Sequence, residues 1–106
     1  MSFALFFKEE AQSDIQGSYT WYEEKLKGLG DRFIYALEEY FDDIRNNPFM
    51  NQERKLGVRY GFVHTFPYVV VYEIEEKNII IDAVFNTQES LRVEKKKEID
   101  SLFLSK

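Results

Sequence analysis

The side chains best suited to chemistry in this 106-residue chain are basic, and such cations bind anions or neutralise a phosphate group. Arg54, Lys55 and Arg59 form one group, and a second group runs through residues 92–97. Together they could mark one anion-facing surface. The second group equally fits the solvated side of a C-terminal helix. Arg59 falls within an expected strand, where a long cation needs a partner or an open groove.

Other kinds of site find little support in the sequence. His64 is the only histidine and there is no cysteine, so the ligand sets typical of zinc are missing. Adjacent acids such as Glu38 and Glu39 would point about 100° apart on a helix and cannot converge on one bond. Neither a GxGxxG nor a P-loop motif is present. We therefore expect no metal and no cofactor, and interpret His64 as a packing residue.

The charge balance bears on the kind of partner. The net charge is -5 and the pI is about 4.9, the opposite of the balance that grips a phosphate backbone. Direct nucleic-acid binding is therefore disfavoured. Residues 1–50 carry five bases against ten acids, whereas residues 51–106 carry nine of each. An anionic partner would meet the second half of the chain.

Length and composition predict one domain covering residues 1–106. Hydrophobic residues make up 44% of the chain and aromatic residues 17%, so large rings can build the core without disulfides or a structural metal. The apolar run at residues 3–7 is too short for a signal peptide, and no segment is long enough to span a bilayer. With no cysteine present, we expect a cytoplasmic protein.

The first half has the pattern of a strand followed by a helical hairpin. Residues 3–7 are apolar and of strand length, and helical spacing follows over residues 8–27. Gly28-Leu29-Gly30 interrupts this spacing, which then resumes until Asn46-Asn47-Pro48. Two amphipathic helices joined by a short glycine loop predict an αα-hairpin. The apolar stripes are Ala11, Ile15, Tyr19, Tyr22 and Leu26, and then Phe33, Leu37, Tyr40, Phe41 and Ile44.

The second half predicts an antiparallel sheet of three to four strands, which makes the fold class α+β. Strand patterns cover residues 58–60, 62–65, 68–75 and 79–85, with a short polar loop at 76–78. The runs 69–71 and 79–81 are apolar on both faces, so the sheet needs cover beyond the hairpin. A short C-terminal helix with Ile99, Leu102 and Phe103 is one candidate, and a partner is the other.

The order of elements and several short motifs resemble the RelE/ParE toxin superfamily, which includes the plasmid-stabilisation proteins. The resemblance covers about residues 3–85. It rests on Ala11-x-x-Asp14-Ile15, Gly28-Leu29-Gly30-Asp31-Arg32-Phe33, Asn47-Pro48, Val58-Arg59-Tyr60, Phe66-Pro67-Tyr68, Tyr72-Glu73-Ile74 and the run from Ile79 to Phe85.

The resemblance implies a small toxin neutralised by an antitoxin, whose helix or strand lies across the sheet and the hairpin. It also implies departures. Relatives that cut mRNA on the ribosome carry an arginine where this chain has Val69. Many end the last strand with histidine and arginines, where this chain reads Asn86-Thr87-Gln88-Glu89. Asn86 cannot shuttle a proton, and Gln88 and Glu89 cannot neutralise phosphate charge.

Three functions are consistent with these observations. The first is the toxin of a type II toxin–antitoxin (plasmid stabilisation) system that binds a protein target such as DNA gyrase and is not an enzyme. The alternatives are a ribosome-dependent mRNA endoribonuclease and a degenerate, non-toxic binding module. A homodimer stays open. No catalytic residue is assigned, and the predicted partner-binding residues are Arg59, Tyr68, Tyr72, Lys55 and Asn86.

Overall fold

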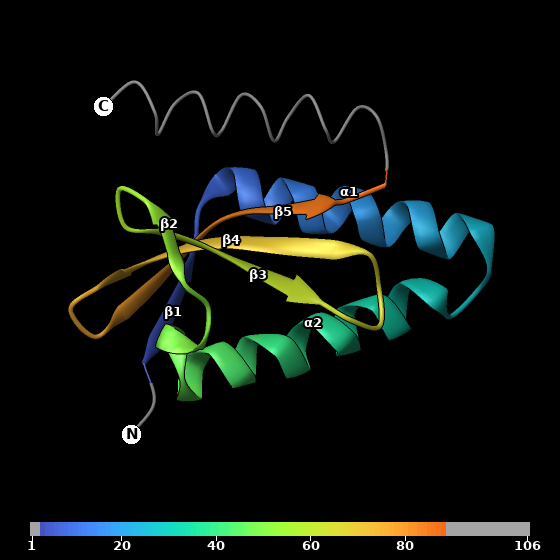
Figure 1. Cartoon of the computed structure of the whole chain (residues 1–106). Helices are drawn as coiled ribbons and strands as arrows, with labels where there is room; N and C mark the ends of the chain where they lie inside the picture. Colours follow the sequence, from blue (N-terminus) through green and yellow to red (C-terminus); the bar gives the residue numbers. More distant parts are fainter. Residues whose placement is uncertain (1–2, 89–106) are drawn as a thin grey trace.

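Two helices cover one face of a five-stranded sheet in the computed structural model, which describes residues 3–88 (Figure 1). None of the described helices is both long and apolar enough to cross a bilayer. The elements in chain order are β1 (Ala4–Phe7), α1 (Glu9–Lys25), α2 (Leu29–Asn46), the 3-10 turn η1 (Pro48–Met50), β2 (Glu53–Lys55), β3 (Val58–Val63), β4 (Tyr68–Glu75) and β5 (Asn78–Asn86).

The sheet has the strand order β1-β5-β4-β3-β2. Its antiparallel part, β2 to β5, has four strands, and the predicted α+β class and helical hairpin are confirmed. The strands differ in detail from those expected. Residues 58–60 and 62–65 were expected as separate strands, but β3 runs unbroken from Val58 to Val63, and the remaining strand is β2. The N-terminal strand β1 joins the sheet as a parallel neighbour of β5.

A carboxylate of α1 holds the glycine loop between the two helices in place. Glu23 of α1 accepts hydrogen bonds from the backbone N–H groups of Gly28 (2.8 Å) and Gly30 (2.9 Å), so it occupies the N-terminus of α2. Gly28 has φ +89°, which favours glycine. At Gly30 the helices approach so closely that an added Cβ would lie 2.7 Å from the backbone oxygen of Tyr19. In the Gly-Leu-Gly motif, Gly28 is therefore needed for its backbone conformation and Gly30 for the close approach of the two helices.

We expect Gly30→Ala to lower the free energy of unfolding by about 1 to 2 kcal/mol, because the new methyl group must push α1 and α2 apart. Urea unfolding followed by circular dichroism measures the change. Gly28→Asn is the matched control, since nothing lies within 4 Å of a Cβ at that site and asparagine tolerates the left-handed region. Equal stability of Gly30→Ala and the wild type would contradict the close approach.

The sheet buries apolar side chains on both faces, as the sequence predicted for its central strands. One cluster lies between the sheet and the helices and contains Phe33, Leu37, Tyr68, Val70 and Tyr72 among others. The predicted C-terminal helix with its apolar residues lies outside the described residues. The second cluster consists of Val58, Tyr60, Val69, Val71, Ala83 and Phe85, each at most 7% exposed.

A β-bulge lets β5 contribute to both clusters. Ala83 pairs with Val71 and Ile81 pairs with Tyr72, so Asp82 is the extra residue between them. Simple alternation from Ile81 would place Ala83 and Phe85 against the helices. The extra residue moves them to the second cluster instead.

Charged side chains secure the stretch of β5 that β1 does not cover. Asp14 of α1 is 2% exposed and accepts a hydrogen bond from the backbone N–H of Val84 at 3.0 Å. Lys8 Nζ lies 2.8 Å from Asp82 Oδ1 and 3.9 Å from Glu73 Oε2. The hydrogen bond and charge of Asp82 raise the pKa of Lys8. Apart from this ion pair, the buried Asp82 carboxylate has no hydrogen-bond partner in the described residues.

Candidate functional site

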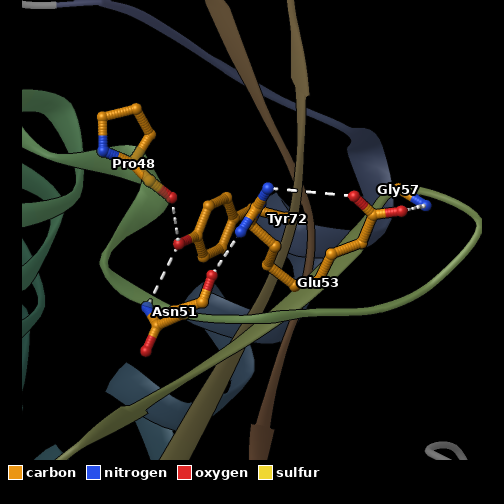
Figure 2. A network of polar contacts seen from close by, with 6 residues as sticks. Pro48, Asn51, Glu53, Gly57 and Tyr72 are labelled. Atoms are coloured by element: carbon orange, nitrogen blue, oxygen red, sulfur yellow. Dashed lines mark hydrogen bonds and ion pairs between the residues drawn. The ribbon is translucent and has the colours of Figure 1, made fainter.

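Arg59 and Tyr72, two of the five predicted site residues, lie directly opposite each other on β3 and β4. Both take part in a network of polar contacts at the edge of the sheet (Figure 2). The network joins β3 and β4 to the segment formed by residues 48–57, which we call the arm. The arm contains η1, β2 and the turn into β3, and runs from the end of α2 along the edge of the sheet.

Two phenols and one amide form the buried and half-buried part of the network. The Tyr72 hydroxyl donates to the backbone oxygen of Pro48 at 2.8 Å. Asn51 Nδ2 donates to the hydroxyls of Tyr72 (3.1 Å) and Tyr40 (3.2 Å). Burial raises the pKa of both phenols, so both are neutral at physiological pH. Their hydroxyls therefore fix the arm in place and are poorly suited to give up a proton.

Arg59 has the partners that its place in a strand requires. Its guanidinium donates to the backbone oxygen of Asn51, lies 3.8 Å from Glu53 Oε1, and sits 5.2 Å from the centre of the Phe49 ring. Its side chain is only 14% exposed. Glu53 also accepts a hydrogen bond from the Gly57 N–H at 3.0 Å, which fixes the turn at the end of the arm. The Arg59 guanidinium is thus paired with groups of the arm, and little of its surface is left to contact an external anion.

Gly61 makes room for the network. An added Cβ at this position would overlap the Tyr40 hydroxyl and lie 2.7 Å from Asn51 Nδ2. A glycine inside a strand often marks such a close approach, and this was the signal in the sequence that could have pointed to the network. Sequence reasoning missed Asn51, Tyr40 and Glu53 as members.

The other three predicted site residues lie elsewhere. Tyr68 is 2% exposed and packs into an aromatic cluster in the core. Lys55 is exposed on the edge strand β2. Asn86 is 6% exposed at the end of β5, and its side-chain oxygen accepts a hydrogen bond from the Gln88 N–H at 2.8 Å. The structure therefore gathers Arg59 and Tyr72 but does not bring the five residues to one surface.

The geometry offers few groups for catalysis. Val69, which stands where the resemblance places an arginine, is fully buried in the second cluster. His64 is exposed just after β3 and outside the network, so its interpretation as a packing residue of a strand is wrong. Within residues 3–88 no three histidine or acidic side chains gather in a way that could hold a metal ion. The network is thus a structural support for an exposed segment.

We expect Tyr72→Phe to lower the free energy of unfolding by about 1 kcal/mol, because the Pro48 carbonyl and the Asn51 amide each lose a partner while the ring still fills its site. Thermal unfolding measures this change. Tyr35→Phe is the control, since Tyr35 is 64% exposed. If both variants match the wild type, the hydroxyl does not hold the arm.

Solved structures with the same arrangement define the class of fold. The chromosomal ParDE toxin–antitoxin system from P. aeruginosa matches with a TM-score of 0.69 and 15% identity over 78% of this chain and 94% of the other. The isolated E. coli RelE toxin matches with a TM-score of 0.62 and 19% identity over 92% and 99%. An E. coli RelE mutant in complex with a peptide of the antitoxin RelB matches with a TM-score of 0.61 and 17% identity over 91% and 95%. At these identities the likeness shows a RelE/ParE-type fold.

Sequence comparison identifies the family. The family model for the ParE toxin of the type II toxin–antitoxin system parDE matches residues 5–91. The chain therefore belongs to the ParE toxin family, as the resemblance in its motifs implied. A search of curated protein sequences finds no significant relative.

Proposed function

We propose that this ParE-type toxin acts in the cytoplasm by binding a protein target of the DNA gyrase type, without cutting RNA, and that an antitoxin from an adjacent gene neutralises it. The observation that carries the proposal is that the Arg59 guanidinium is paired with Asn51 and Glu53 of the arm. Phosphoryl transfer needs cations free to face the phosphate and a group that moves a proton. The network offers a paired guanidinium and two neutral phenols instead.

The solved relatives support an antitoxin partner. One is described as a ParDE toxin–antitoxin system, and another is a RelE toxin in complex with an antitoxin peptide. We propose that the predicted partner-binding residues act in three ways. Lys55 contacts the partner directly, while Arg59 and Tyr72 act indirectly by holding the arm. Tyr68 and Asn86 support the sheet from buried positions.

Growth arrest and gyrase inhibition test the proposed function. Expression of the chain in E. coli should stop growth, and co-expression with the product of the adjacent reading frame should restore it. The purified toxin should inhibit supercoiling of relaxed plasmid by gyrase, and the antitoxin should relieve the inhibition. Normal growth with full gyrase activity would contradict the proposal and favour a non-toxic binding module.

We also expect no ribosome-dependent mRNA cleavage, because the network holds no group suited to carry a proton and its one cation, Arg59, is paired with the arm. Toeprinting on translating ribosomes measures this, with an active RelE toxin as the positive control. Specific cleavage at an A-site codon would show that this chain is an endoribonuclease and that other side chains perform the reaction.

A further inference from the structure

The arm displays apolar side chains that the rest of the protein leaves uncovered. Phe49, Met50 and Leu56 are 61%, 42% and 54% exposed. They make up three of the eight large hydrophobic side chains that are exposed in residues 3–88, although the arm has only residues 48–57. Exposed apolar side chains gathered on one short segment typically mark an interaction site.

The polar network keeps these side chains in place. Hydrogen bonds at Pro48 and Asn51 fix the first half of the arm, and Glu53 fixes the second half through Arg59 and Gly57. A segment fixed before binding loses little conformational freedom when a partner arrives, which favours affinity. The network thus gives the exposed residues a preformed shape.

The outward charge of the arm is positive. Its one acid, Glu53, is engaged by Arg59. Arg54 stacks over the Tyr60 ring at 4.5 Å, and neither Arg54 nor Lys55 forms an ion pair within residues 3–88. A basic segment on a chain of net charge -5 complements an acidic partner. Nucleic acid fits less well, since the arm offers only two cations without an ion pair in residues 3–88.

We propose that the arm is the docking surface for an acidic amphipathic segment of a protein partner. Apolar side chains of that segment pack on Phe49, Met50 and Leu56, and its carboxylates face Arg54 and Lys55. The seven residues from Met50 to Leu56, six steps along the chain, span at most about 20 Å, which a helix of about 13 residues can follow. The inference rests on the proposed protein-binding function and adds the location and the chemistry of the contact.

The test uses the full chain, labelled with ¹⁵N, and two synthetic helical peptides of about 16 residues. One carries leucines on one face with flanking glutamates, and the other has lysine in place of every glutamate. We expect the acidic peptide to shift the amide signals of the arm, with an affinity that falls as salt is added, and the basic peptide to shift none.

Variants of the arm make the test specific. The double variant Phe49→Ala/Met50→Ala and the single variant Lys55→Glu should each bind the acidic peptide at least about tenfold more weakly. Tyr35→Ala, which removes an equally exposed ring from the acidic face of α2, should bind as the wild type does. Unfolding curves confirm that each variant is folded.

The inference would be overturned by shifts outside the arm alone, by equal binding of both peptides, or by arm signals that change with protein concentration. The last result would mean that a second copy occupies the surface. Binding of an RNA oligonucleotide to the arm in preference to the acidic peptide would overturn it as well. If the adjacent gene product still neutralises the toxin while arm variants bind it unchanged, only this inference fails. If that product does not neutralise the toxin, the proposed function fails separately.

Discussion

Replacing Tyr68 by alanine is expected to lower the free energy of unfolding by about 3 to 5 kcal/mol, a large part of the stability of a domain of this size. The Tyr68 ring lies 4.7 Å from Phe33 and 6.2 Å from Tyr22, between centroids, and the residue is 2% exposed. Its removal would leave a cavity in the middle of the first cluster, which the surrounding rings can fill only in part.

Urea unfolding measures the loss, and Tyr68→Phe is the matched control because it keeps the ring and removes only the hydroxyl. We expect Tyr68→Phe to lose about 1 kcal/mol or less. With both results, any weaker partner binding by Tyr68→Ala would be explained by unfolding and not by a lost contact with the partner. If Tyr68→Ala is as stable as the wild type, Tyr68 is not a core residue, and the prediction that it contacts the partner directly is restored.

Lys8→Met should cost about 2 kcal/mol at neutral pH. The substitution leaves Asp82 buried with no compensating charge. A fully buried pair broken in this way loses about 3 to 5 kcal/mol. We expect less because the Lys8 side chain is 54% exposed and solvent screens it. Lys27→Met at an exposed position is the control.

The pH dependence of this effect follows from the raised pKa of Lys8, whose ordinary value is 10.5. A lysine with a raised pKa in the folded state stabilises the fold fully below its ordinary pKa. This contribution is lost as the pH rises through the raised pKa. The stability difference between the wild type and Lys8→Met should therefore be steady near neutral pH and shrink above pH 10.5. Asp82→Asn should reduce the difference at neutral pH, and a cost that persists in that background would contradict the ion-pair explanation.

Much of the fold was predictable because local patterns determine it. The helical hairpin follows from apolar periodicity broken at Gly28-Leu29-Gly30, and β4 follows from its β-branched run. Two features depend on contacts between distant residues and leave no periodic signal. One is the parallel pairing of β1 with β5, and the other is the bulge at Asp82, which looks like an ordinary polar residue in an apolar run.

The site was less predictable for a related reason. A cation in a strand was expected to need a partner, and the structure supplies that partner for Arg59. The partners are a backbone oxygen and a carboxylate of the arm, and nothing in their residue types distinguishes them from surface groups. Tyr68 and Tyr72 have the same residue type on the same strand, but one packs in the core as a ring and the other ends in a polar network.

The parallel pairing of β1 and β5 also sets an order of events during protein synthesis. Ala4 pairs with Asn78, which the ribosome adds 74 residues later. At about 5 to 20 residues per second, β1 waits about 4 to 15 s for its neighbour. The helices can form in that time, but the sheet that carries the arm still lacks β5, which lies between β1 and β4. A newly made chain therefore cannot acquire its finished surface until β5 has been translated, which separates the start of its synthesis from the start of its activity.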